Sequence, residues 1–306
     1  MAPLFERIKV RGRLAAKEPM SRHCSWRAGG SAEHYFEPAD CRDLIDYLPQ
    51  IERNEAITWI GLGSNMLIRD GGLPGTVIST AKNLSAYEWL DNQRLSVECG
   101  LPCAKVAKSA AKKTLVGAAF LAGIPGTIGG ALAMNAGAYG REIWSVVESV
   151  DLVSRAGVVR RRDRSHFSVS YRHVEVPPDH WFVGAILRFD VATSPQSEGE
   201  IRELLTQRNA SQPTGRASCG SVFKNPPGDY AGRLIEAAGM KGARSGGCSV
   251  SHKHANFIIN DGGATAADIE ALIVDVRRTV ASKFGVSLEP EVRIMGRTRQ
   301  QENEIY

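Results

Sequence analysis

The spacing of hydrophobic residues predicts a chain that mixes helices with strands. Apolar residues recur at helical intervals in five segments: residues 40–48, 104–113, 200–210, 230–238 and 266–284. The last segment is the longest, and its apolar stripe runs from Ile269 to Phe284. Thr265 and Asp268 have the spacing of a capping box, so we expect this helix to begin there.

Runs rich in β-branched and aromatic residues predict the strands. They are residues 56–62, 77–79, 95–99, 144–153, 158–162, 181–191, 254–260 and 288–295. Helices and strands do not alternate strictly, which favours an α+β fold. The polar stretch 193–200, with Pro195 and Gly199, is the best candidate for a linker between domains.

One uncharged segment has the length of a membrane span. Residues 116–139 carry no charge over 24 positions. They include six glycines, Pro125 and Asn135 but few large aliphatic residues. A buried segment rich in turns explains this composition better than a transmembrane helix, and we expect no membrane association.

Composition and charge narrow the class of protein. Of 306 residues, 43% are hydrophobic and 23% are charged, which is ordinary for a globular protein and excludes a collagen, a coiled coil or a disordered chain. The net charge is +5, from 38 basic and 33 acidic residues. The densest basic run, residues 160–164, has no interleaved aromatic residues, so we expect a solvated strand end and no nucleic-acid partner.

The cysteines do not form a metal-binding or disulfide pattern. None of the six belongs to a CxxC pair, and no His/Cys spacing matches a zinc site, so we expect no metal. The first 20 residues lack the apolar region of a signal peptide. We therefore expect free thiols and a cytoplasmic protein.

Two glycine clusters are candidates for binding an anionic ligand. Residues 61–65 (GLGSN) directly follow a predicted strand, but Met66 breaks the dinucleotide fingerprint and no Walker lysine follows. Residues 123–130 (GIPGTIGG), continuing to residue 140, let backbone approach a flat or phosphorylated ligand. A tight turn explains the first cluster equally well, and a packed glycine turn is the alternative for the second. Together they suggest one large ligand, and a dinucleotide fits.

The candidate ligand-binding residues follow from these clusters. They are Gly61, Gly63, Ser64, Asn65, Gly123, Pro125, Gly126, Thr127, Gly129, Gly130, Asn135, Gly137 and Ala138.

Seven motifs occur in a specific order. They are GLGSNMLI (61–68), AGIPGTIGGALAMNAGAYG (122–140), SYR (170–172), CGSVFKNP (219–226), AGRLIEAAGMKG (231–242), SHKHANFIIN (251–260) and EPEVRIMG (289–296). Together they resemble the UDP-N-acetylenolpyruvoylglucosamine reductase family of bacterial peptidoglycan precursor synthesis. The resemblance covers residues 20–296, and the absence of a tyrosine-bearing lid insertion matches the shorter subtype.

The resemblance implies an FAD-binding fold of the vanillyl-alcohol-oxidase (PCMH) type. It implies a first FAD-binding subdomain at 1–75, completed by residues 288–306, a second at 76–193 and a substrate-binding domain at 200–287. It also implies non-covalent FAD, NADPH as reductant and a nucleotide-sugar substrate. We expect a monomer with a role in cell wall biogenesis, and hence in cell shape and division.

The implied reaction converts UDP-N-acetylglucosamine enolpyruvate into UDP-N-acetylmuramate. NADPH reduces FAD, and hydride then passes from flavin N5 to C3 of the enolpyruvyl group. Ser221 matches the family's proton donor to C2, whereas a serine in a turn is otherwise most often a local cap. Arg172 and Glu291 match the positions that stabilise the enolate. Glu289 lies two residues from Glu291, on the same face of a predicted strand, so the residues alone do not separate the two.

The resemblance also suggests substrate contacts. These are Lys224, Asn225, His254, Asn256 and Arg293. For His254, a satisfied core histidine is an equally good interpretation. Cys219 departs from the alanine expected in many relatives, and simple packing explains it best.

Two other functions remain open from the sequence. One is an FAD oxidase of the same fold acting on a sugar lactone or alcohol, and the other is a nucleotide-sugar binding module without catalysis. The CGSVFKNP and EPEVR motifs argue against the first. Arg172, Ser221 and Glu291 argue against the second.

Overall fold

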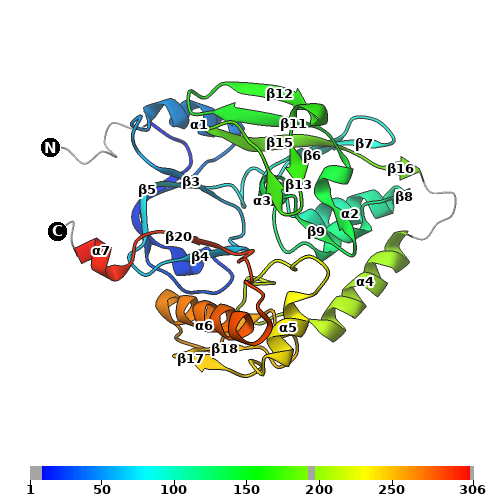
Figure 1. The fold of residues 1–306 in the computed structure, drawn as a ribbon. Helices are drawn as coiled ribbons and strands as arrows, with labels where there is room; N and C mark the ends of the chain where they lie inside the picture. Colours follow the sequence, from blue (N-terminus) through cyan, green and yellow to red (C-terminus); the bar gives the residue numbers. More distant parts are fainter. Residues whose placement is uncertain (1–8, 192–196, 304–306) are drawn as a thin grey trace. The chain divides into compact units, whose positions relative to one another are not determined.

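The computed structural model describes residues 9–191 and 197–303, which fall into two compact units (Figure 1). Unit 1 comprises Met1–Ala15, His34–Leu62 and Thr76–Gln207, and unit 2 comprises Ala16–Glu33, Gly63–Gly75 and Arg208–Tyr306. Several of the passages from one unit to the other fall within strands, namely β1 (Arg13–Pro19), β2 (Ser31–Glu37) and β5 (Leu73–Ser79). Each unit is therefore assembled from segments far apart in the sequence.

A five-stranded antiparallel sheet is the centre of unit 1. Its order is β12-β11-β15-β7-β6 (Figure 1). The strands are β6 (Tyr87–Trp89), β7 (Arg94–Glu98), β11 (Val147–Ser154), β12 (Val159–Asp163) and β15 (His180–Arg188). Their sequences alternate between two buried faces: Val150 and Leu152 of β11 join one core, and Val153 joins another.

Two helices pack on one face of this sheet. They are α2 (Cys103–Lys112) and α3 (Ile128–Met134), preceded by the 3-10 turn η4 (Ala119–Gly123). Their small residues, such as Ala107 and Ala131, are buried against the sheet and bring the glycine-rich segment close to it. The other core surrounds α1 (Cys41–Tyr47), whose Asp40 accepts a capping hydrogen bond from the Asp43 amide.

Short paired strands complete unit 1. β3 (Ile57–Ile60) runs parallel to Thr76–Ser79 of β5. The remaining pairs are β8 (Leu115–Val116) with β16 (Asp190–Val191), β9 (Gly137–Ala138) with β10 (Arg141–Glu142), and β13 (Val169–Ser170) with β14 (His173–Val174). The 3-10 turns are η3 (Leu48–Gln50), η5 (Ile143–Ser145) and η6 (Arg164–His166).

Unit 2 is built around its long helix. This helix, α6 (Ala266–Phe284), buries Ile269, Leu272, Ile273 and Val276 against α5 (Ala231–Ala237) and the strands. Full burial of each such side chain stabilises the fold by about 1.5–3 kcal/mol before entropy is counted. The strands are β17 (Arg244–Ser245), β18 (Cys248–Val250) and β19 (Ile258–Asn260) in one sheet, and the parallel pair β4 (Met66–Ile68) and β20 (Arg293–Met295). The 3-10 turn η2 (Met20–Arg22) and α7 (Arg299–Asn303) complete this part of the chain.

The elements confirm the α+β prediction and most of the predicted helices. The helix predicted at 266–284 has those bounds, with both hydrogen bonds of the Thr265–Asp268 capping box. The helix predicted at 200–210 begins earlier, in α4 (Ser197–Ser211). The linker prediction at 193–200 is therefore wrong for 197–200, while 193–196 lie outside the described residues.

Several predicted strands are too long. The strand predicted at 254–260 covers only Ile258–Asn260, because residues 254–257 form a turn in which the Phe257 amide donates to the His254 carbonyl oxygen. The strand predicted at 288–295 covers only Arg293–Met295. The hairpin strand predicted from residue 144 begins at Val147, after η5. The division into three domains stays a prediction, and residues 1–75 are shared between the two units.

Residues 116–139 form short elements and turns. They contain β8, η4, α3 and β9. None of the helices in the described ranges 9–191 and 197–303 is both long and apolar enough to span a membrane.

Candidate functional site

The loop that carries Ser221 is fixed by its two neighbours. Gly220 has a φ of 73°, a left-handed conformation that favours glycine and turns the chain just before Ser221. Val222 and Phe223, which follow, are buried in the core of unit 2 and anchor the loop. Ser221 itself is half-buried. The sequence CGSVF therefore places a hydroxyl between a glycine turn and two core anchors.

Two other segments hydrogen-bond to this loop, one on each side. On one side, Asn256 binds the main chain of Val222 and Phe223. On the other side, the Glu291 amide donates to the Val222 carbonyl oxygen at 2.8 Å. Phe223 and Pro290 form an isolated antiparallel bridge. The structure thus brings the predicted catalytic residues Ser221 and Glu291 onto adjacent backbones within unit 2.

Glu289 and Glu291 occupy different surroundings. The segment that contains them is not a regular strand, so the shared strand face expected from the sequence does not exist. The Glu289 carboxylate forms an ion pair with the Lys224 ammonium at 2.6 Å and its side chain is 69% exposed. Glu291 is half-buried, and its main chain is bonded at both its amide and its carbonyl oxygen. This difference favours Glu291 as the carboxyl group at the site.

Asn65 connects the first glycine cluster to the Glu291 segment. Its side-chain amide donates to the Glu291 carbonyl oxygen at 3.1 Å, and its own main-chain carbonyl oxygen accepts from the Arg293 amide at 3.1 Å. The parallel pairing of β4 with β20 extends these contacts. Asn65 therefore orients the segment that carries Glu291, whatever it binds in addition.

Gly63 has a structural reason to be glycine. Its φ is 59°, and a Cβ there would lie 2.1 Å from the His23 carbonyl oxygen. The Ser25 amide donates to the Gly63 carbonyl oxygen at 3.0 Å. These contacts support the interpretation of Gly63 as part of a tight turn. The next residue, Ser64, is half-buried.

Cys219 is a packing residue. Its thiol is buried and lies 3.3 Å from the Met66 carbonyl oxygen and 3.6 Å from that of Gly63. Burial raises the pKa of this thiol to about 12. The neutral thiol therefore predominates near pH 7, and the group is a poor nucleophile.

The predicted substrate contacts differ in what their side chains bind. The Asn225 oxygen accepts from the Ala231 amide at 3.1 Å and so caps the first turn of α5. The His254 ring packs edge-on against Phe257, and burial lowers its pKa below the usual value. Arg293 is exposed at the start of β20.

Arg172 belongs to unit 1, where the second glycine cluster holds it. It lies in the two-residue loop between β13 and β14 with a φ of 57°, an uncommon conformation for arginine. Its guanidinium donates to the Asn135 and Gly137 carbonyl oxygens at 3.3 and 3.4 Å. The side chain is only 15% exposed. The backbone of the cluster thus fixes the direction of a largely covered cation.

Asn135 and Glu142 complete the surroundings of Arg172. The buried Asn135 side chain donates to the Glu142 carboxylate at 2.6 Å and to the carbonyl oxygen of Ser170 at 3.0 Å. The same carboxylate lies 3.8 Å from the guanidinium. Sequence reasoning did not find Glu142, because only the β9–β10 hairpin brings it back to Asn135. Strands of two residues give no local signal of such a pairing.

The glycine cluster of unit 1 contains a buried polar atom that suits a ligand. Thr127 is 1% exposed, and its hydroxyl has no hydrogen-bond partner in the described part of the chain. A Cβ on Gly61 would lie 2.3 Å from this hydroxyl, and one on Gly130 would lie 3.8 Å from it. Close packing against Thr127 therefore explains glycine at position 61, whereas position 130 is in ordinary contact distance. The buried hydroxyl itself, which has no partner among the described residues, is the feature that fits a polar group of FAD.

Other glycines of the cluster pack against the protein itself. A Cβ on Gly123 would lie 2.5 Å from the Tyr139 ring, and one on Gly129 would lie 2.8 Å from the Cys99 side chain. A Cβ on Gly137 would meet the Arg141 carbonyl oxygen at 2.4 Å. For these three positions, close packing alone explains the glycine. Of the remaining candidates, Pro125 is exposed, and Gly126 and Ala138 are half-buried.

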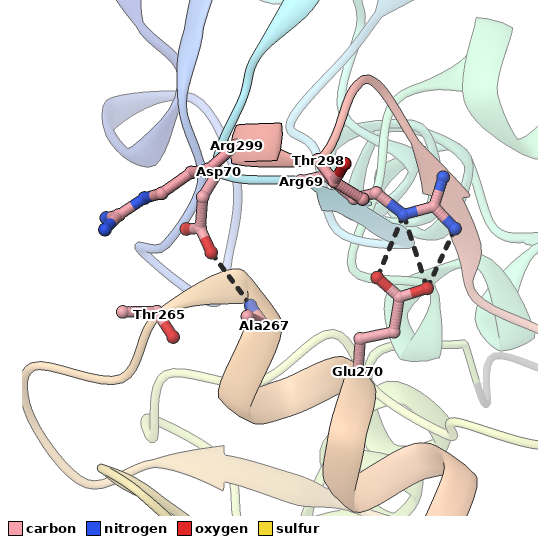
Figure 2. A pocket seen from close by; sticks show the side chains of 7 residues that line it. All are labelled: Arg69, Asp70, Thr265, Ala267, Glu270, Thr298 and Arg299. Atoms are coloured by element: carbon pink, nitrogen blue, oxygen red, sulfur yellow. Dashed lines mark hydrogen bonds and ion pairs between the residues drawn. The ribbon is translucent and has the colours of Figure 1, made fainter. Parts of the chain in front are cut away.

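A small pocket in unit 2 contains none of the predicted site residues. It is lined by Arg69, Asp70, Thr265, Ala267, Glu270, Thr298 and Arg299. Figure 2 shows the Arg69 guanidinium facing the Glu270 carboxylate, which it meets at 2.8 Å, and the Asp70 carboxylate bonded to the Ala267 amide at 3.0 Å. These contacts fasten the end of β4 to the start of α6, so we assign the pocket a structural role.

No cluster of metal-ligating side chains occurs among residues 9–191 and 197–303. The Ser221 hydroxyl in unit 2 and the Arg172 guanidinium in unit 1 are hydrogen-bond donors, and each suits an anionic organic substrate.

Known proteins resemble this chain over nearly all of its length. Residues 32–162 match the model of an FAD binding domain. Residues 212–295 match that of the UDP-N-acetylenolpyruvoylglucosamine reductase C-terminal domain. The reductase of that name from Alkalilimnicola ehrlichii is 52% identical, over 93% of this chain and 95% of the relative. The chain belongs to the UDP-N-acetylenolpyruvoylglucosamine reductase family.

Further members of the family support the assignment over 94% of the chain. The reductase from Methylococcus capsulatus is 52% identical over 94% of both chains. The crystal structure of the Thermus caldophilus reductase superposes with a TM-score of 0.81 at 28% identity, covering 94% of this chain and all of that one. The fold expected from the seven motifs is therefore confirmed.

Proposed function

We propose that this chain is the flavoenzyme that reduces UDP-N-acetylglucosamine enolpyruvate to UDP-N-acetylmuramate, with NADPH as the source of electrons. The observation that carries the proposal is the pairing of the Ser221 loop with the Glu291 segment, inside the region that matches the family's C-terminal domain. Bound FAD would supply the hydride that C3 of the enolpyruvyl group receives. Gly61, Thr127 and Gly130 are our candidates for holding it.

Ser221 supplies the proton in this proposal. Addition at C3 leaves negative charge at C2, delocalised into the neighbouring carboxylate. The Ser221 hydroxyl donates its proton to C2 and becomes an alkoxide, which solvent reprotonates. Serine is a weak acid, so this transfer needs a strongly basic carbon and a fixed donor position. The left-handed Gly220 and the buried Val222 and Phe223 supply that fixed position.

Arg172 and Glu291 hold the substrate carboxylate in this proposal. The planar guanidinium of Arg172 matches a carboxylate and offsets the charge of the enolate. Its direction is set before substrate arrives, since Asn135 and Gly137 hold it. Glu291 in its acid form donates a hydrogen bond to the same carboxylate.

The remaining assignments are also proposals. Lys224, His254 and Arg293 are our candidates for contacts with the nucleotide sugar. Asn225 and Asn256 bind main chain with their side chains, which supports an indirect role for both. We further propose that FAD is held without a covalent bond, since burial keeps the thiols neutral. We propose that the enzyme works in the cytoplasm as a monomer, in peptidoglycan precursor synthesis.

An anaerobic visible spectrum of the purified protein tests the proposed function. We expect flavin bands that bleach when NADPH is added and return when UDP-N-acetylglucosamine enolpyruvate follows. Bands that bleach but return only with air would contradict the substrate and favour the oxidase of the same fold. A colourless protein that does not take up FAD would contradict the flavin assignment.

A further inference from the structure

We propose that Asn256 is the positioning residue for Ser221. The inference rests on the proposed function, in which Ser221 gives the proton to C2. Asn256 does not act on the substrate in this proposal. Its side-chain amide bonds both main-chain groups of Phe223, as the backbone of a paired strand would, and so fixes the backbone shortly after the proton donor.

The side chain and the carbonyl oxygen of Asn256 converge on two consecutive residues. The Asn256 side-chain oxygen accepts from the Phe223 amide at 2.9 Å, and its side-chain nitrogen donates to the Phe223 carbonyl oxygen at 2.8 Å. The Asn256 main-chain carbonyl oxygen accepts from the Val222 amide at 2.9 Å. Asn256 is only 3% exposed, so water does not compete for these groups.

The same part of the loop is bonded from the opposite side by the Glu291 segment. The carbonyl oxygen of Val222 accepts from the amides of Glu291 and Val292 at 2.8 and 3.3 Å. The Lys224 amide donates to the Glu289 carbonyl oxygen at 2.9 Å. The Glu291 segment therefore binds one set of the loop's main-chain groups, and Asn256 binds those that this segment leaves without a partner, so the loop is held from both sides.

The chemistry at Ser221 makes this placement decisive. A hydroxyl transfers its proton only within hydrogen-bond reach of the basic carbon. A displacement of about 1 Å is enough to slow such a reaction about 100-fold. Substitution of Asn256 should therefore slow reoxidation by the enolpyruvyl substrate and leave reduction by NADPH unchanged.

The amide of Asn256 is both donor and acceptor, and this property gives a sharp test. In N256D, the acid form of the introduced carboxyl group keeps one acceptor for the Phe223 amide and one O–H donor for the Phe223 carbonyl oxygen. The carboxylate form has no donor and places a charge against that oxygen. Burial raises the pKa of a carboxyl group by up to about 3–5 units, because it disfavours the charged form. The variant should regain function as the pH falls through this raised pKa.

The experiment is a stopped-flow measurement of both half-reactions for wild type, N256D and N256A between about pH 6 and pH 9, the range that such a raised pKa reaches. Rates are taken as the ratio of variant to wild type at each pH, which divides out titration of the neighbouring His254, Lys224, Glu289 and Glu291. We expect N256A to reoxidise about 100-fold more slowly at every pH. For N256D, the ratio should be low at the alkaline end and rise at least about tenfold toward the acidic end. Above the pKa of the introduced carboxyl group, the fraction in the acid form rises about tenfold for each pH unit that the pH falls.

N260D is the matched control. Asn260 lies four residues along the chain, and its side chain also binds main chain, donating to the Trp26 carbonyl oxygen at 2.8 Å and accepting from the Gly262 amide at 2.9 Å. Neither of these two side-chain hydrogen bonds is made to residues 219–226. We expect N260D to lose stability without any rise in the reoxidation ratio at low pH.

A structural readout accompanies the kinetics. Amide hydrogen exchange of the peptide 219–226 should be faster in N256D at the alkaline end of the range than at the acidic end, after correction for intrinsic rates, and unchanged in N260D. If wild type reoxidises with the substrate but the N256D ratio is flat with pH, or falls equally in both half-reactions, Asn256 has no positioning role. If wild type itself fails to reoxidise, the proposed function fails first.

Discussion

At the scale of single residues, Ser221 carries the most specific prediction. S221A should leave reduction by NADPH within about twofold of wild type and slow reoxidation by the enolpyruvyl substrate by about 10²–10⁴-fold, the usual contribution of a general acid. S249A is the control, since the Ser249 hydroxyl binds the Asp261 carboxylate at an exposed position in the same unit. Stopped-flow absorbance at the flavin band measures both half-reactions. Equal losses in the two half-reactions of S221A would contradict the assignment.

Glu289 and Glu291 form a natural pair for a second test. Glu289 pairs with Lys224 at the surface, and exposed ion pairs contribute about 0–1 kcal/mol. We expect E289Q to keep the rate of reoxidation within about threefold, and E291Q to lower it by about 10²-fold or more through loss of the stabilised enolate. Steady-state kcat and KM of both variants decide between them. The reverse ranking would assign the role to Glu289.

At the scale of elements, the start of α6 shows how local contacts stabilise the unit. Asp70 accepts from the amides of Ala266 and Ala267, both at 3.0 Å, and the Thr265 hydroxyl accepts from the Asp268 amide at 3.1 Å. The first three amides of the helix are therefore satisfied without water. Loss of the threonine hydroxyl leaves one of them without its cap.

T265A should lower the free energy of unfolding by about 1 kcal/mol near pH 7. Hydrogen bonds from the Thr265 amide and hydroxyl hold the pKa of Asp268 below its usual value. Asp268 therefore stabilises the fold above its unfolded pKa, and this contribution disappears as the pH falls through the lower folded value. Urea unfolding at several pH values measures both effects. T279A is the control: the Thr279 hydroxyl binds the Asp275 carbonyl oxygen within the helix, so alanine should be neutral or slightly stabilising.

The elements also show what a sequence can and cannot predict. The bounds of α6 follow from periodicity and a capping box, both of which are local. The turn at residues 254–257 looks like part of a strand by composition, because it runs into the apolar residues 257–259. Its geometry depends on hydrogen bonds to residues more than 30 positions away. Pro290 is the local signal that residues 288–295 do not form a continuous strand, because proline has no amide to donate to a neighbouring strand. Long-range pairing decided both cases.

The same division applies to the candidate site. Motifs located Ser221, Glu291 and Arg172, since each lies in a segment with a recognisable pattern. The roles of Asn256, Asn225 and Glu142 depend on which groups their side chains reach, and no pattern in the sequence encodes that. Asn135 is a candidate for cofactor binding by its motif, and the structure adds that its side chain binds Ser170 and Glu142.

At the scale of the whole molecule, the chain passes repeatedly between its units. Ser221 and Glu291 lie in unit 2, whereas Arg172 and the second glycine cluster lie in unit 1. Neither unit is a continuous stretch of sequence, so truncation of the chain would remove strands from both units. Tests of the site therefore require the full chain, and the two half-reactions serve to separate cofactor chemistry from substrate chemistry.

The cysteines give a prediction for the molecule as a whole. All six are free thiols, and five of them are buried. Burial raises the pKa to about 12 for Cys99, Cys103 and Cys219 and to about 11 for Cys41 and Cys248, and it raises that of Cys24 as well. Because the thiolate is the reactive form, the folded protein should be nearly inert to thiol reagents at about pH 8.

We expect fewer than one thiol to react promptly with Ellman's reagent in the native protein, with half-buried Cys41 the first to do so, and all six to react in urea. Iodoacetamide treatment of the native protein should therefore leave both half-reactions unchanged. C41A identifies any prompt fraction, because it removes the least buried thiol. Prompt labelling of Cys219 would show instead that the loop before Ser221 opens in solution. Since the Cys219 thiol lies against the carbonyl oxygens of Gly63 and Met66, such opening would separate the Ser221 loop from the first glycine cluster.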